Sequence, residues 1–218
     1  MSRYQDTVKF RKLRYQLVNS IREKGINDER VLAAIRSIPR QFFMPEDLLG
    51  LSYIDKAFPI GEGQTISQPY TVAYQTQLLD VHPTHRVLEI GTGSAYQAVI
   101  LAILAAEVFT IERQKKLFER NREFHYLNEF PNLYFFYGDG YEGLPDLAPF
   151  DRILLTAAAP VIPPKLVDQL KSGGKMVLPL GADKPQRMVR LTKDEHDEIS
   201  SEYFADFLFV PMLYGKKE

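Results

Sequence analysis

The stretch RVLEIGTGSAY, residues 86–96, decides the predicted fold. Its mainly apolar run Val87–Ile90 is typical of a buried parallel strand. Gly91 and Gly93 follow, and glycines here permit a tight turn and a close approach of the backbone to a ligand. Because the sequence becomes helix-forming near Tyr96, the stretch predicts a strand, a glycine loop and a helix start, which together are typical of a nucleotide site.

Acidic residues follow the next two predicted strands. Glu112 ends the apolar strand Val108–Ile111, 21 residues after the first glycine, close to the roughly 20-residue offset at which an acid binds ribose in a βαβ unit. The strand Leu133–Tyr137 runs into Asp139 and Gly140. The carboxyl ends of parallel strands meet at one edge of a sheet, so these acids predict a ligand site there. An ordinary turn residue is the alternative for the aspartate.

Two residues favour S-adenosylmethionine over a dinucleotide. Tyr96 occupies the position of the third glycine in the G-x-G-x-x-G fingerprint. Glu89 lies two residues before the first glycine, so we expect its carboxylate near the mouth of the loop. There it would repel a pyrophosphate and attract an α-ammonium and a sulfonium. Capping of loop N–H groups is its alternative role. We expect S-adenosylmethionine and S-adenosylhomocysteine to bind, and NAD not to bind.

Composition narrows the class of protein. The chain has 218 residues and 45% hydrophobic content, enough for one substantial core, and its 27 basic and 28 acidic residues nearly cancel. It has no cysteine, which excludes disulfides and thiolate chemistry, and its scattered histidines do not have metal-binding spacing. The N-terminus lacks a secretory apolar core, and the longest apolar run, Ala98–Ala106, is far below the ~18 residues of a membrane span. We expect a soluble, cytoplasmic monomer that binds no nucleic acid, membrane or metal.

Two amphipathic helices are predicted before this core. Apolar spacing predicts one over residues 5–24 and a second from an Asn27 cap to Pro39. The next stretch is irregular and rich in aromatic residues, proline and glycine, as in a lid or connector. Within one domain, residues 1–218, we therefore distinguish an N-terminal helical and lid segment, 1–63, from a cofactor-binding core with C-terminal strands, 64–218.

Ser67 has two possible roles. It precedes Pro69 by two residues and lies before an apolar helical face. This placement is typical of a helix N-cap, since proline is well tolerated in a first turn. The same hydroxyl, beside the free N–H groups of a helix start, could hold a carboxylate. The pattern alone leaves both roles open.

The rest of the chain alternates helix and strand and then becomes rich in strand. The predicted elements are a polar helix at 114–128, a strand at Arg152–Leu155, a helix at Pro163–Leu170, a turn at Ser172–Gly174, a strand at Lys175–Leu180 and two long strands joined by Asp194–Glu198. This order predicts an α/β fold with a doubly wound, mostly parallel Rossmann-like sheet, an N-terminal helical segment and a C-terminal antiparallel extension.

Several segments together resemble one known family. They are GQTISQPY (63–70), VLEIGTGSAYQA (87–98), FTIE (109–112), GDG (138–140), APFDRILLTAAAP (148–160) and LKSGGKMVLPLG (170–181). These runs are similar to protein-L-isoaspartate O-methyltransferase, a class I S-adenosylmethionine-dependent methyltransferase. The methyltransferase motifs alone give the class, and TISQP makes the resemblance specific. One departure is Ala95, where many members have glycine, and it affects the fine geometry of the loop.

The resemblance implies methylation of the free α-carboxylate of L-isoaspartyl residues in damaged proteins and peptides, after which the ester closes to a succinimide and repair begins. It also implies the site. The expected cofactor-binding residues are Glu89, Gly91, Thr92, Gly93, Ser94, Glu112 (ribose), Asp139 (adenine edge) and Gly140. The expected substrate-binding residues are Thr65, Ile66, Ser67 and Gln68, of which Ser67 is the catalytic residue and orients the carboxylate. The alternatives are a methyltransferase for RNA or a small molecule, and a non-catalytic S-adenosylmethionine-binding protein.

Overall fold

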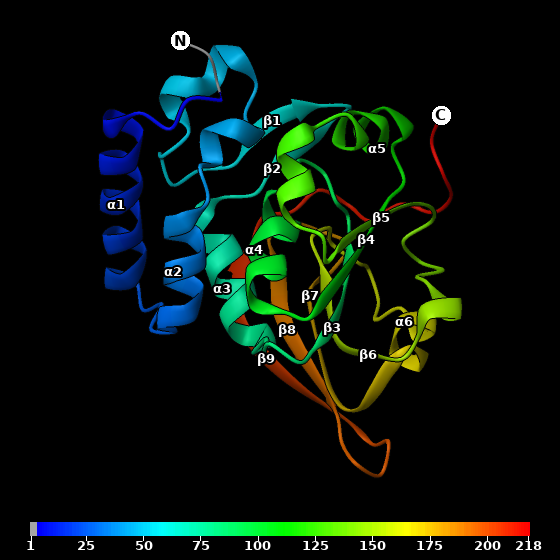
Figure 1. Ribbon diagram of the computed structural model, residues 1–218. Helices are drawn as coiled ribbons and strands as arrows, with labels where there is room; N and C mark the ends of the chain where they lie inside the picture. Colours follow the sequence, from blue (N-terminus) through cyan, green and yellow to red (C-terminus); the bar gives the residue numbers. More distant parts are fainter. Residues whose placement is uncertain (1–3) are drawn as a thin grey trace.

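A seven-stranded sheet lies at the centre of the computed structural model, which describes residues 4–218 (Figure 1). Its strand order is β5-β4-β3-β6-β7-β8-β9. Neighbours from β5 to β7 pair in parallel, whereas β8 pairs antiparallel with both β7 and β9. The predicted α/β fold, with a mostly parallel sheet and an antiparallel C-terminal extension, is confirmed.

The strands of this sheet are β3 (Arg86–Ile90), β4 (Glu107–Glu112), β5 (Leu133–Tyr137), β6 (Phe150–Leu155), β7 (Leu170–Leu180), β8 (Gln186–Lys193) and β9 (Ile199–Phe207). A separate antiparallel hairpin consists of β1 (Phe58–Gly61) and β2 (Gln64–Ile66). The α-helices are α1 (Val8–Glu23), α2 (Glu29–Ser37), α3 (Pro69–Leu79), α4 (Tyr96–Leu104), α5 (Lys115–Arg122) and α6 (Pro164–Asp168). Short 3-10 helices are η1 (Arg40–Phe43), η2 (Glu46–Leu51), η3 (His125–Glu129) and η4 (Pro145–Leu147).

Apolar layers cover both faces of the sheet. Val87 belongs to the cluster that contains Val99 of α4, and Leu88 belongs to the cluster that contains Leu166 of α6. Side chains alternate along a strand, so these two neighbours in β3 point to opposite layers, and both are fully buried. A strand with two buried faces needs a nearly continuous apolar run, which is why the sequence identified β3 and β4.

Several predicted boundaries differ from the structure. The second helix has its N-cap at Asp28, whose carboxylate accepts the N–H of Arg30, and not at Asn27. The polar helix predicted for 114–128 ends at Arg122 and is followed by η3. The lid segment contains β1, which lacks a clear alternating pattern. None of the helices described in residues 4–218 is long and apolar enough to cross a bilayer.

The predicted turn at Ser172–Gly174 is wrong, because β7 runs through it. The pairing of β6 with β7 shifts register between Phe150 and Arg152, which accommodates the irregular glycine segment. A Cβ on Gly174 would lie 2.6 Å from the carbonyl oxygen of Lys171. The glycines therefore permit an irregularity within the strand.

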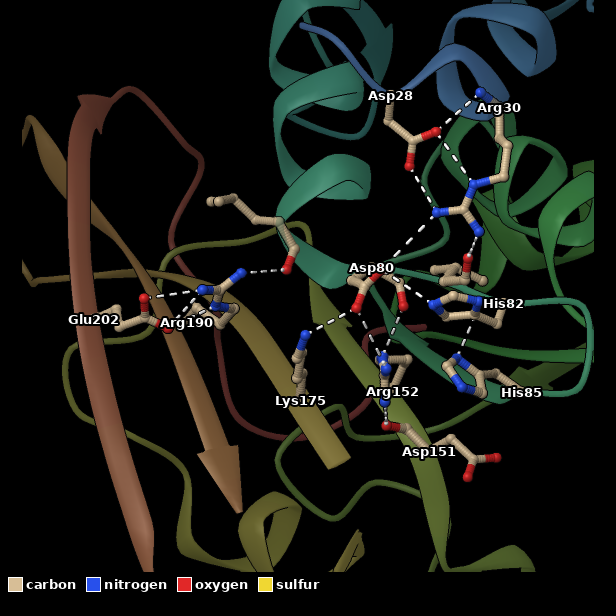
Figure 2. A network of polar contacts seen from close by, with 12 residues as sticks. Asp28, Arg30, Asp80, His82, His85, Asp151, Arg152, Lys175, Arg190 and Glu202 are labelled. Carbon is tan, nitrogen blue, oxygen red and sulfur yellow. Dashed lines mark hydrogen bonds and ion pairs between the residues drawn. The ribbon is translucent and has the colours of Figure 1, made fainter. Parts of the chain in front are cut away.

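A polar network around Asp80 joins α3 to the sheet, at the end opposite the carboxyl ends of the parallel strands (Figure 2). Asp80 caps α3 with a left-handed backbone, φ 54°. Its carboxylate accepts Lys175 Nζ of β7 at 2.8 Å, and its carbonyl accepts Arg152 Nε of β6 at 3.0 Å. His82 Nε2 lies 3.2 Å from the carboxylate. One residue thus joins a helix end to two strands.

We expect Asp80→Asn to lower the free energy of unfolding by about 1 kcal/mol at pH 7, since the carboxylate is one-third exposed and partly screened. Asparagine keeps the side-chain size and tolerates the left-handed backbone. The hydrogen bond from Lys175 holds the pKa of Asp80 below its usual value. The stability that it contributes is therefore present above about pH 4 and is lost as the pH falls through the folded pKa.

Urea unfolding of both proteins at pH 7 and at pH 3.5 measures this difference. The gap between their midpoints should be smaller at pH 3.5. Identical midpoints at pH 7 would show that the charge of Asp80 does not stabilise the fold.

Candidate active site

A pocket lies at the carboxyl ends of β3 and β4, beside the first turn of α4. It brings together predicted residues from distant parts of the chain. They are Thr65, Ile66 and Ser67 after the β1–β2 turn, Gly91, Thr92, Gly93 and Ser94 of the glycine loop, Glu112 at the end of β4 and Gly140 after β5. Gln68 lines a neighbouring second pocket, and Glu89 and Asp139 line neither of the two.

The glycine loop is built against Thr156, which follows β6. Thr156 Oγ1 lies 2.6 Å from the carbonyl oxygen of Gly91 and 3.0 Å from that of Ile90, and it donates to them. Gly91 has φ 98°, and a Cβ there would lie 2.5 Å from Thr156 Oγ1. Sequence reasoning missed Thr156. The small residues of TAAAP were its only signal, and they did not indicate a hydrogen bond to the loop.

The backbone conformation at position 95 explains why glycine is common there in the family that the sequence resembles. Ala95 precedes α4 and adopts φ 67°, a region that L-residues with a Cβ adopt at a cost. It is also fully buried. The loop therefore keeps the glycine-like backbone geometry despite the alanine side chain.

Glu112 connects the glycine loop to the end of β4. One carboxylate oxygen accepts the N–H of Gly93 at 2.9 Å, and the other accepts the N–H of Gln114 at 2.8 Å. Burial raises its pKa. Because the carboxylate is fixed by two backbone donors and still lines the pocket, it is placed to accept hydroxyl groups of a bound ribose.

Glu89 lies inside the sheet and not at the mouth of the loop, which corrects our expectation. Its side chain is fully buried, because position 89 faces the helices that pack on β3. Thr110 Oγ1 donates to its carboxylate at 2.5 Å, and Thr92 Oγ1 lies 2.7 Å from Thr110 Oγ1. Burial raises the pKa of Glu89 to about 8. The acid therefore reaches the pocket only through two hydroxyl groups.

Two buried oxygen atoms, one in Glu89 and one in Gln97, lack donors in the described part of the chain. Within residues 4–218, Glu89 Oε1 and Gln97 Oε1 accept no hydrogen bond. Gln97 lines the pocket, and its amide nitrogen donates to Thr76 Oγ1 at 3.0 Å, which leaves the oxygen as the unused group. Of the two, only the Gln97 oxygen lines the pocket, and a buried acceptor without a donor there favours a ligand that donates a hydrogen bond. The site thus fits the α-ammonium of S-adenosylmethionine better than an anion.

Asp139 contacts the C-terminal segment. Its carboxylate accepts the N–H of Tyr141 at 2.9 Å and the N–H of Gly215 at 2.7 Å. The rings of Tyr141 and Tyr214 stack with centroids 3.8 Å apart. Arg113 donates to the carbonyl oxygens of Tyr214 and Gly215. The C-terminal segment, which sequence reasoning did not connect with the site, therefore holds the acid beside the pocket.

Ser67 is not the N-cap of α3. That position belongs to Gln68, whose side chain makes no capping hydrogen bond, because the chain stays extended one residue further and Pro69 begins the helix. Within the described part of the chain, Ser67 Oγ makes no hydrogen bond, and the residue is half-buried. Its hydroxyl is therefore available to a ligand.

The second pocket, of about 480 Å³, meets the first at Ser67. The residues that line both pockets are Thr65, Ser67, Thr156 and Val210. We refer to these four residues as the junction. A donor in the first pocket and an acceptor in the second would meet there, beside the free hydroxyl of the serine.

Comparisons with known proteins agree with this arrangement. A family model described as "Protein-L-isoaspartate(D-aspartate) O-methyltransferase (PCMT)" matches residues 12–217. The chain belongs to this family. Two relatives named protein-L-isoaspartate O-methyltransferase are each 50% identical to it. The one from Flavobacterium johnsoniae aligns over 97% of this chain and 99% of its own length, and the one from Cytophaga hutchinsonii over 96% and 94%.

A solved structure from Plasmodium falciparum has the same fold. It is described as a beta-aspartate methyltransferase (PCMT) in complex with S-adenosyl-L-homocysteine. It is 27% identical, has a TM-score of 0.79, and the alignment covers 92% of this chain and 98% of that one. The family resemblance that the sequence motifs indicated is confirmed.

We expect Gly91→Ala to lower the affinity for S-adenosylhomocysteine at least tenfold more than Gly93→Ala. A Cβ at Gly91 would lie 2.5 Å from Thr156 Oγ1, whereas a Cβ at Gly93 would have Ile60 Cδ1 at 3.6 Å as its nearest neighbour. Both glycines have positive φ, but 98° at Gly91 lies outside the left-handed region that L-residues can adopt whereas 52° at Gly93 lies within it, so backbone strain adds to the steric contact at Gly91. Isothermal calorimetry measures both affinities. Equal losses would mean that contact with Thr156 does not determine the loop.

We expect Glu89→Gln to reduce the pH dependence of stability. The folded pKa of about 8 is raised, so the stability linked to the protonated acid is fully present below about pH 4.3 and is lost as the pH rises through 8. Between pH 5 and 8 the free energy of unfolding should fall less steeply in the variant than in the unmodified protein. Denaturant unfolding at several pH values gives both slopes. An unchanged slope would contradict the buried acid as its source.

Proposed function

We propose that this chain transfers a methyl group from S-adenosylmethionine to the free α-carboxylate of L-isoaspartyl residues in damaged proteins and peptides. The main-chain amide nitrogen next to the ester then attacks the ester carbonyl and releases methanol, which gives a succinimide and begins repair. Family membership supports the reaction. The single observation that carries the assignment of the site is the junction, where the unbonded hydroxyl of Ser67 lies between two pockets.

The first pocket fits the cofactor. The glycine loop and Gln97 would hold its methionine end, Glu112 its ribose, and Gly140 with Asp139 its adenine edge. Bound S-adenosylmethionine supplies a methyl group already activated by a sulfonium. What the protein adds is position, because the unpaired Gln97 Oε1 would fix the methionine end and the Glu112 carboxylate, held by two backbone N–H groups, would fix the ribose.

The acceptor needs no general base. A peptide carboxyl group has a pKa near ~3.5–4, so it is ionised at neutral pH and is itself the nucleophile. The task of the chain is then to align the carboxylate with the methyl group and to exclude water. Ser67 can donate its hydroxyl to one carboxylate oxygen, which leaves the other oxygen to attack. Thr156 and Val210, which line both pockets, would restrict the rotation of the bound carboxylate.

The second pocket would hold the peptide around the isoaspartyl residue. Gln68 lines this pocket, whereas Thr65 lines both pockets. Ile66 is 2% exposed and belongs to the apolar core, so it would support the segment more than it contacts substrate. We infer that the segment Thr65–Gln68 separates donor from acceptor.

Other properties stay predictions. We propose one methyltransferase domain over residues 1–218, acting as a monomer in the cytoplasm on protein substrates, without a nucleic-acid or membrane partner. The near balance of 27 basic and 28 acidic residues supports the last part, because a strong basic field is absent.

Transfer of labelled methyl groups to matched isoaspartyl and aspartyl peptides tests the proposal, with RNA as a further acceptor. We expect label only on the isoaspartyl peptide. Equal labelling of both peptides would overturn the substrate assignment, and labelled RNA would favour the alternative methyltransferase. Cofactor binding without transfer to any acceptor would favour a non-catalytic protein.

We expect Ser67→Ala to lower turnover by roughly 10- to 150-fold, the effect of one hydrogen bond of ~1.5–3 kcal/mol to a charged group. Cofactor affinity and melting temperature should stay close to those of the unmodified protein, since Ser67 does not cap α3. Single-turnover rates at saturating cofactor, beside thermal melts, measure both. Normal turnover in the alanine variant would show that the hydroxyl does not orient the acceptor.

A further inference from the structure

The second pocket contains an unpaired positive charge. Its charged lining residues are Lys56 and Asp206. Asp206 is neutralised by Arg187, whose Nε lies 2.6 Å from its carboxylate. The Lys56 ammonium, in contrast, forms no ion pair or hydrogen bond with any residue in the described range 4–218. The pocket therefore presents one uncompensated cation to a bound peptide.

The nearest carboxylate in the sequence does not neutralise this cation. Asp55 precedes Lys56, but its carboxylate accepts Lys24 Nζ at 2.6 Å and the N–H of Tyr70 at 2.8 Å. Both of its oxygen atoms are thus used by partners other than Lys56. The positive charge of Lys56 is therefore neutralised neither by Asp55 nor by Asp206, since both carboxylates pair with other residues.

The hairpin places Lys56 close to the junction but outside it. Phe58 of β1 pairs with Ile66 of β2 in antiparallel register. Lys56 lies two residues before β1 and Gln68 lies two residues after β2, and both residues line the second pocket. Lys56 lines the second pocket and not the first, so it faces the peptide and not the reacting carboxylate or the methyl donor.

We propose that Lys56 is a specificity-determining residue that favours isoaspartyl substrates with an acidic side chain next to the damaged residue. This inference rests on the proposed function, because it assigns the second pocket to the acceptor peptide. The Lys56 side chain is exposed, so its attraction to a carboxylate is screened and should change kcat/KM by roughly two- to fivefold at low salt.

The experiment uses isoaspartyl peptides that carry Glu, Gln or Lys at the position before or after the isoaspartyl residue. The unmodified protein is compared with Lys56→Gln and Lys56→Glu. Lys12→Glu is the matched control, since Lys12 is an exposed residue of α1 that lines neither pocket. Initial rates of methyl transfer give kcat/KM at 20 mM and 300 mM NaCl, as illustrative low- and high-salt conditions spanning about 20 to 6 Å of screening length.

With the varied residue before or after the isoaspartyl residue, in at least one of the two positions, kcat/KM of the unmodified protein should be two- to fivefold higher for the Glu peptide than for the Gln peptide. It should be lowest for the Lys peptide. Lys56→Gln should remove this order, Lys56→Glu should invert it, and Lys12→Glu should preserve it. High salt should reduce the preference.

Equal rates for all flanking residues, or a preference that survives both Lys56 substitutions, would overturn the role of Lys56. Methylation of the Gln peptide by all four proteins distinguishes that outcome from failure of the proposed function, in which no isoaspartyl peptide is methylated.

Discussion

The hydrogen bonds from Thr156 to the end of β3 are the contact on which the rest of the site depends. Because β3 and β6 pair in parallel, the residue after β6 lies beside the residue after β3, and its hydroxyl reaches the carbonyls of Ile90 and Gly91. The turn at Gly91 then directs the N–H of Gly93 toward Glu112. One hydroxyl thus sets the direction in which the loop leaves the sheet.

The polar side chains at the two ends of the parallel strands differ in whether their hydrogen bonds are satisfied. At one end, Asp80, Arg152 and Lys175 satisfy one another and join helix to sheet. At the other end, acceptors such as Gln97 Oε1 lack partners within residues 4–218. Buried polar groups without partners cost stability, so they persist where a ligand supplies the missing donors. The satisfied polar groups therefore stabilise one end of the strands, and the unsatisfied groups at the opposite end are available to hydrogen-bond a ligand.

The sequence predicted those features that depend on local pattern. Buried strands such as β3 need continuous apolar runs, and the backbone of the glycine loop needs residues without a Cβ, so both could be identified from neighbouring residues. Contacts between distant segments could not. Thr156 beneath the loop, Gly215 on Asp139 and the burial of Glu89 each depend on which strands become neighbours. The role of Ser67 was ambiguous because a serine shortly before a proline can either cap a helix or keep its hydroxyl free. The structure decided between these roles, because Gln68 is also extended and takes the N-cap position in place of Ser67.

The junction has a consequence for the kinetic order of the proposed reaction. The two pockets share Thr65, Ser67, Thr156 and Val210 but are otherwise lined by different residues. In the proposed assignment, each reactant occupies its own pocket while the other pocket is filled, and neither product must leave before the second reactant enters. Such a layout favours a ternary complex with direct transfer, for which double-reciprocal plots intersect, over a methylated enzyme intermediate with parallel plots. In the proposed function, the wall shared by the two pockets thus favours the rate law of a ternary complex.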